Sequence, residues 1–157
     1  LVLINPNEDP LGAGYHIIQS QIAIGSGQFF GKGLFSGSQS QLNFLPENHT
    51  DFIFSVIGEE LGFVGSILLV LVYGYLLYRT LQIALAAQDD FGLLLAVGIA
   101  SMWLFQLLVN VGMTMGIMPV TGLPLPFVSY GLSSLMTNIL SVAILLNIHV
   151  RRKKISF

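Results

Sequence analysis

Residues 91–113 read FGLLLAVGIASMWLFQLLVNVGM, and this stretch decides the fold class. It contains no Asp, Glu, Lys or Arg, and the charge-free sequence continues from Phe91 to Val150. A helix needs about 20 mostly apolar residues to cross the hydrocarbon core of a bilayer, which is about 30 Å thick. The stretch therefore predicts a membrane-spanning helix over residues 91–113.

Two segments on either side of this helix have the same apolar character. The first predicted span covers Phe52–Tyr78 and is closed by Arg79, and the third covers Phe127–Val150. The connection at 118–126 reads MPVTGLPLP, and irregular backbone at membrane depth needs protein or water around it. The sequence therefore predicts an all-α, polytopic integral membrane protein.

The composition excludes several other classes of protein. Of the 157 residues 54% are hydrophobic and only 9% are charged, whereas a soluble domain carries about 25% charge. The sequence has no Cys, which excludes disulfides, thiol catalysis and cysteine-ligated metals. The only basic cluster is Arg151–Lys154, at the end of an apolar segment, so we expect no nucleic-acid partner.

The basic residues also predict the orientation in the membrane. Arg151–Lys154 should be cytoplasmic, because cytoplasmic segments next to membrane spans are enriched in Lys and Arg. Counting back over three spans places the connection between Arg79 and Asp90 inside. The proline-rich connection and residues 1–50 then lie outside the cytoplasm.

We expect two parts in the chain. Residues 1–50 form a long extracytoplasmic loop region with short amphipathic helices, including one over Tyr15–Ile24 with an apolar side of isoleucines. Residues 51–157 form a transmembrane bundle segment that ends in a basic cytoplasmic tail at 151–157. Because the sequence begins with Leu1 and shows no signal peptide, we interpret it as the C-terminal part of a longer protein.

A polar cluster lies at the outer end of the first predicted span. Glu47, His49 and Asp51 fall close together there. One interpretation is helix capping by Asn48 or Thr50, with an acid in the first turn facing the helix dipole. The other is a functional site, because charged groups at a membrane boundary need a partner or water. The residue pattern alone favours capping slightly and leaves both open.

Other polar residues fall within the predicted spans. Glu59 and Glu60 are equally consistent with a hydrogen bond inside the bundle, involving a basic residue elsewhere, and with a functional role. Gln106 and Asn110 share one helical face, a pattern more typical of contacts between helices than of catalysis. Ser129 lies in a run of small polar residues that favours close packing.

Three long motifs carry a family resemblance. The first runs over residues 5–33 and contains DPLGAGYH, GSG and GKG, the second runs over 44–63, and the third reads GIMPVTGLPLPFVSYG at 116–131. Together they resemble the SEDS family (shape, elongation, division and sporulation), and the GYH and GKG details favour its rod-shape branch over the division branch. Leu132 departs from the family pattern, which usually has a second glycine there.

The resemblance implies a ten-span protein of which this chain is the last third. It implies a peptidoglycan glycosyltransferase that polymerises lipid II during cell elongation, at the outer face of the bacterial cytoplasmic (inner) membrane. It also implies a class B penicillin-binding protein, a transpeptidase, as partner within the elongation machinery. The family's essential acid, in its His-Thr-Asp motif, corresponds to Asp51.

This activity gives the polar residues expected roles. Asp51 is the predicted general base of an inverting glycosyl transfer, because a sugar hydroxyl is a poor nucleophile. The departing pyrophosphate needs positive charge, which Lys32 or a divalent cation could supply. Gln39, Glu47 and His49 are predicted to orient the substrate or hold that cation. No nucleotide is expected on the outer side.

Two alternatives remain at the level of sequence. One is a flippase that transports lipid-linked precursors, to which Gln106 and Asn110 give weak support, although transport sites usually lie near the membrane midplane. The other is a scaffold that only docks the transpeptidase. An assay of glycan extension by the purified protein distinguishes these alternatives from an enzyme, because neither a flippase nor a scaffold extends glycan.

Overall fold

The structure, a computed structural model, describes residues 13–33 and 51–151. All regular elements in this part of the chain are helices: α1 (Ala13–Ser26), α3 (Ile53–Glu60), α4 (Gly62–Leu85), α5 (Asp90–Thr114) and α6 (Leu132–Arg151). Only α4, α5 and α6 are long and apolar enough to cross a membrane, among the residues described. The predicted all-α membrane fold is confirmed.

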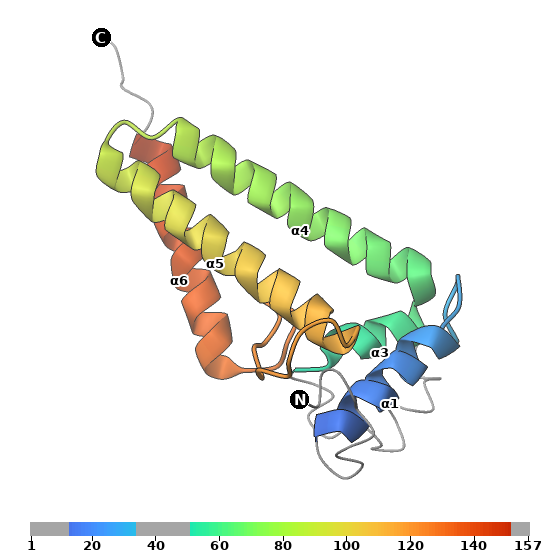
Figure 1. The fold of residues 1–157 in the computed structure, drawn as a ribbon. Helices are drawn as coiled ribbons and strands as arrows, with labels where there is room; N and C mark the ends of the chain where they lie inside the picture. The colour runs from blue at the N-terminus through green and yellow to red at the C-terminus, as the bar shows by residue number, and fades with distance from the viewer. Residues whose placement is uncertain (1–12, 34–50, 152–157) are drawn as a thin grey trace.

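The three long helices form the body of the molecule (Figure 1). α4 and α5 run antiparallel along each other, and α6 packs against both. α1 and α3 lie together across the lower end in Figure 1, where the connection between α5 and α6 also lies. The opposite end carries the α4–α5 turn and the end of α6. The fold therefore gathers its irregular and short helical segments at one end of the bundle.

The first predicted span is wrong in its boundaries. The segment predicted as one helix over 52–78 is divided at Leu61 into α3 and α4. Gly62 has φ +67°, and a Cβ there would lie 2.3 Å from the amide nitrogen of Gly31. The break therefore needs glycine, since the backbone that follows α1 packs directly against it. At its other end α4 continues past Arg79, which bonds Gln82 one turn later.

The other two spans differ less from their predictions. α5 extends the predicted 91–113 by one residue at each end. α6 begins at Leu132 and not at Phe127, because the chain makes turns over 126–129. In these turns the backbone N–H of Leu125 donates to Ser129 Oγ at 2.7 Å, and this bond closes the connection before α6 starts.

The helix α1 includes the predicted range Tyr15–Ile24, but its buried face is not the predicted side of isoleucines. Ile17, Ser20 and Ala23 form its buried stripe against α3 and α5, whereas Ile22 is nearly half exposed. The Ser20 hydroxyl donates to the carbonyl of Thr114 at 2.7 Å and lies 2.7 Å from the Ser55 hydroxyl. Hydrogen bonds thus fix α1 to the ends of both neighbouring helices.

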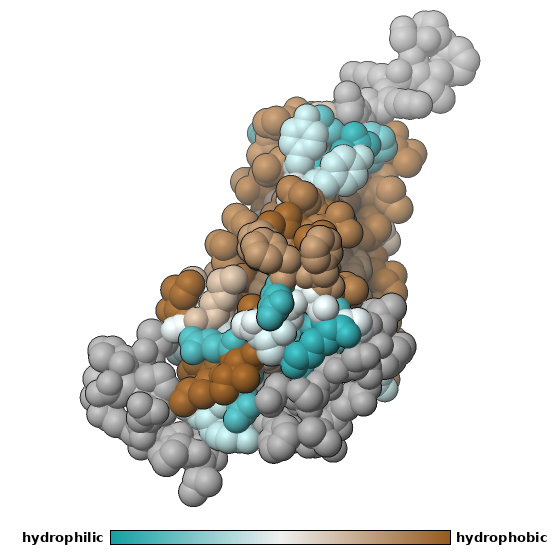
Figure 2. All heavy atoms as spheres, turned by 90° about the vertical axis from the view of Figure 1, so that its right-hand side faces the viewer, coloured by the Kyte–Doolittle hydropathy of each residue, from teal (hydrophilic) through white to brown (hydrophobic). Residues whose placement is uncertain are grey.

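One core cluster of the bundle contains Trp103 together with Ala84, Ala96 and Leu145, which come from the three long helices. Trp103 Nε1 donates to Asn138 Oδ1 at 2.9 Å. Outside this core much apolar surface is uncovered, above all on α4, where Leu68 and Leu71 are more than half exposed. Figure 2 shows this surface as an apolar band between two hydrophilic zones. Such a patch needs a membrane or further helices to cover it.

Candidate functional site

Asp51 lies in the turn immediately before α3, half-buried at the end of the bundle that carries α1. The N-cap position of α3 is Phe52, which makes no side-chain cap bond. Asp51 is therefore not the capping residue at this position. The alternative caps considered for the sequence, Asn48 and Thr50, lie outside the described residues.

The fully buried side chain of Asn110 holds Asp51 from the α5 side. Its Nδ2 donates to the backbone carbonyl of Asp51 at 3.0 Å and to that of Leu123 at 2.9 Å. One amide group thus joins α5, the turn before α3 and the proline-rich connection. Its own Oδ1 is buried without a hydrogen-bond partner among the described residues.

The proline-rich connection comes close to the Asp51 carboxylate at Gly122. Gly122 has φ +67°, and a Cβ at this position would lie 3.3 Å from Asp51 Oδ2. The connection is anchored farther along, where the Tyr73 hydroxyl donates to the carbonyl of Pro126. The backbone of a glycine, with no side chain, therefore lies next to the carboxylate.

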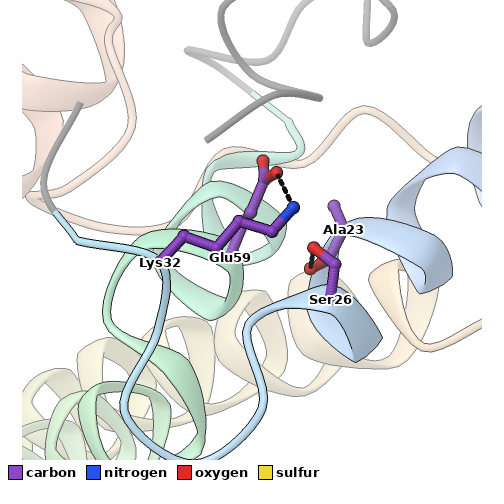
Figure 3. A network of polar contacts seen from close by, with 4 residues as sticks. All are labelled: Ala23, Ser26, Lys32 and Glu59. Carbon is purple, nitrogen blue, oxygen red and sulfur yellow. Dashed lines mark hydrogen bonds and ion pairs between the residues drawn. The ribbon is translucent and has the colours of Figure 1, made fainter. Parts of the chain in front are cut away.

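A second polar feature lies at the other end of α3. Lys32 Nζ is 3.0 Å from Glu59 Oε1, and Figure 3 shows the two side chains pointing toward each other. The Glu59 side chain is fully buried, while that of Lys32 is about one third exposed. The backbones of Glu59 and Asp51 are separated by about 12 Å, since α3 rises 1.5 Å per residue. Lys32 is thus paired with Glu59 well away from the Asp51 backbone.

Backbone hydrogen bonds reinforce this ion pair. The amide of Lys32 donates to the carbonyl of Glu59 at 3.0 Å, and that of Gly33 donates to the carbonyl of Glu60 at 3.1 Å. Glu60 itself is half-buried. The segment that follows α1 is therefore fastened to the end of α3 by charge and by backbone pairing together.

The structure leaves some predicted site residues undescribed. Gln39, Glu47 and His49 lie outside the described residues. Gln106 is half-buried and its Oε1 has no hydrogen-bond partner in the described part of the chain. No three His, Asp or Glu side chains gather as a metal site within residues 13–33 and 51–151.

Sequence reasoning missed Gly122 and the link that Asn110 makes to Asp51. The only local signal for Gly122 is a glycine between prolines, which predicts a turn but not what the turn covers. Asn110 is predicted as a contact between helices, whereas both of its bonds go to backbone outside the long helices.

An apolar groove opens between α1, α3, α4 and α5, with a volume of about 690 Å³. Its walls include Ile24, Phe54, Gly58, Phe63 and Val111. The groove lies at the end of the bundle that carries Asp51, where apolar surface continues from α4 toward the polar end.

Comparison with known proteins identifies relatives over the whole chain. The model of the FtsW/RodA/SpoVE family, described as cell cycle protein, matches residues 1–154. The chain is 53% identical over 156 residues to the peptidoglycan glycosyltransferase MrdB of Escherichia coli K12, covering 99% of this chain and 42% of that protein. It is 50% identical to the peptidoglycan glycosyltransferase RodA of Treponema pallidum, covering 97% of this chain and 35% of that protein.

A solved structure is also similar. One of its chains superposes with a TM-score of 0.76 at 37% identity, covering 98% of this chain and 41% of that one. That structure is described as showing the coordination of polymerization and crosslinking by a peptidoglycan synthase complex. The chain thus spans about 42% or less of the length of these relatives.

Proposed function

Because this chain belongs to the FtsW/RodA/SpoVE family of cell cycle proteins, we propose that it supplies the catalytic aspartate of a peptidoglycan glycosyltransferase. The reaction is the polymerisation of lipid II into glycan strands during cell elongation. Relatives named peptidoglycan glycosyltransferase, at about 50% identity, support the activity. The observation that carries the proposal is the placement of the half-buried Asp51 carboxylate beside Gly122.

The proposed chemistry is a single displacement at an anomeric carbon. The 4-hydroxyl of one lipid-linked sugar attacks the anomeric carbon of a glycan held through an α-linked pyrophosphate. The new β-1,4 bond forms as the bond to the lipid pyrophosphate breaks, so the configuration inverts. An inverting displacement needs no covalent enzyme intermediate, and one carboxylate is enough to receive the proton of the attacking hydroxyl.

Asp51 is the proposed general base. Its carboxylate lies at the end of a membrane bundle, where a sugar attached to a membrane-anchored lipid would meet the protein. The absence of a Cβ at Gly122 leaves room beside Oδ2. A base must reach the proton that it removes at hydrogen-bond distance, and we propose that the half-buried Asp51 does so when the sugar is bound.

The leaving pyrophosphate needs compensation of its negative charge. The side chain of Lys32 is about one third exposed, although its ammonium is paired with Glu59. Contact of Lys32 with substrate is therefore a weaker proposal than the role of Asp51. The substrate-orienting or cation-binding roles stay predictions for Gln39, Glu47 and His49, which lie outside the described part of the chain. The divalent cation also stays a prediction.

The proposed location is the bacterial cytoplasmic membrane. The three apolar helices support a multi-pass protein. Asp51, α1 and the proline-rich connection lie at one end of the bundle, and Arg151 lies at the other beside Asp89. Orientation with Arg151 toward the cytoplasm puts Asp51 on the outer side, in keeping with the preference for basic residues inside.

We propose a class B penicillin-binding protein as the partner. The similar solved structure is described as a complex that coordinates polymerization and crosslinking. The uncovered apolar surface of α4 gives a helix of such a partner a place to pack within the membrane. A polymerase and a transpeptidase held together in this way would crosslink strands as they form.

The test is polymerisation of purified lipid II by the complete protein in detergent. Asp51→Asn should abolish the glycan product, while expression and membrane insertion stay normal. Asp90→Asn is the matched control, because Asp90 is an exposed acid at the opposite end of the bundle. Near-normal product from Asp51→Asn would contradict the general-base role. A flippase forms no glycosidic bond, so it would give no glycan product in this assay.

A further inference from the structure

The side-chain amide of Asn110 is fully buried and takes no part in the chemistry proposed above. Its two hydrogen bonds end on backbone carbonyls of segments that are far apart in the sequence, Asp51 and Leu123. A buried side chain that satisfies two carbonyls fixes both, because losing either bond leaves a buried acceptor without a partner.

Both carbonyls belong to segments close to the Asp51 carboxylate. One is that of Asp51 itself, and the other is that of the residue after Gly122, the glycine at which a Cβ would lie 3.3 Å from Asp51 Oδ2. Asn110 on α5 therefore ties together the backbone of Asp51 and the backbone that follows Gly122.

We propose that Asn110 is a positioning residue for Asp51, acting through the backbone of Asp51 and of the Gly122–Leu123 turn. The proposal rests on the role of Asp51 proposed above. Asn110 touches no substrate in this scheme. It holds the carboxylate at the depth and angle needed for proton transfer, and small displacements at such a site cost about 10- to 100-fold in rate.

The main test is Asn110→Leu in the complete protein, which keeps the branched shape of the side chain, although leucine is larger, and removes both hydrogen bonds. Asn138→Leu is the matched control, since Asn138 is also a buried asparagine and bonds Trp103 in the core. We expect both variants to lose thermal stability. Only Asn110→Leu should lose about 10- to 100-fold in polymerisation rate per folded molecule. Binding of fluorescent lipid II should change by less than about twofold in both, as for an interaction made in the transition state.

A second variant changes the surroundings of the Asp51 carboxylate at Gly122. Gly122→Ala places a methyl group 3.3 Å from Asp51 Oδ2 at a φ of +67°, and should lower the rate without weakening lipid II binding. Gly131→Ala is its control in the same connection, because a Cβ there meets only Ser134 at an ordinary 3.7 Å.

The outcomes separate the two proposals. If Asp51→Asn is inactive while Asn110→Leu polymerises at the wild-type rate, the positioning role is overturned and the role of Asp51 stands. Equal loss of rate in Asn110→Leu and Asn138→Leu, per folded molecule, also overturns it. If Asp51→Asn is active, the proposed function itself fails, whatever the asparagine variants do.

Discussion

The ion pair between Lys32 and Glu59 gives a sharp prediction about stability. The perturbations are Lys32→Met, Glu59→Gln and the two together, which remove one charge, the other charge and both. At the observed 3.0 Å the gross attraction is about 5 kcal/mol for an effective dielectric constant of about 20. Desolvation of Glu59, which is fully buried, offsets much of this attraction.

The single variants should therefore differ strongly from the double variant. Removing one partner of a buried pair costs about 3–5 kcal/mol, because it leaves the other charge uncompensated. We expect Lys32→Met to lower the free energy of unfolding by about 3 kcal/mol, at the low end of this range. The Lys32 side chain is about one third exposed, so solvent already screens part of its attraction to Glu59. The double variant leaves no charge and should cost about 1 kcal/mol.

The assay is equilibrium unfolding of the complete protein in mixed detergent micelles, followed by circular dichroism. Polymerisation of lipid II by the double variant adds a second readout. Activity near that of the wild type would mean that Lys32 serves the fold, whereas a stable but inactive double variant would mean that it also contacts substrate. If the double variant loses as much stability as the two single variants combined, the reasoning about the pair is refuted.

Two further predictions concern the break and the core. Gly62→Ala should destabilise the fold by about 1–3 kcal/mol, because its φ of +67° disfavours any side chain and Gly31 lies in the way. Gly74→Ala, with nothing within 4 Å of its Cβ, should be neutral or slightly stabilising in the same unfolding assay, and equal effects of the two would contradict this account. Trp103→Phe should cost about 1–3 kcal/mol by leaving Asn138 Oδ1 buried without its donor, and a smaller loss would mean that water replaces the indole.

The fold class was within reach of the sequence, because the absence of charge is a local property that each span displays by itself. The break at Leu61 was not. The residues on both sides of it are apolar and continue the pattern of a span, and the interruption comes from backbone at 28–31 that packs against Gly62. A contact between segments so far apart in sequence leaves no mark on local periodicity.

The candidate site divides in the same way. Asp51 could be named because it combines a polar cluster at a membrane boundary with a family motif. The sequence also suggested that one acid of the Glu59-Glu60 pair meets a basic residue elsewhere, yet it assigned Lys32 to substrate and not to Glu59. The pairing and the two bonds of Asn110 depend on how helices meet, which residue identity alone does not determine.

The break at Leu61 also has a consequence for depth. If α4 continued straight toward the N-terminus, the backbone of Asp51 would stand about 16 Å beyond Gly62 along the helix axis. That height would carry the carboxylate out of the headgroup layer and into bulk water. Because α3 instead turns aside across the end of the bundle (Figure 1), the turn before it, which carries Asp51, does not continue along the axis of α4. A sugar tethered to a membrane lipid by a short pyrophosphate link could reach Asp51 without its anchor leaving the bilayer.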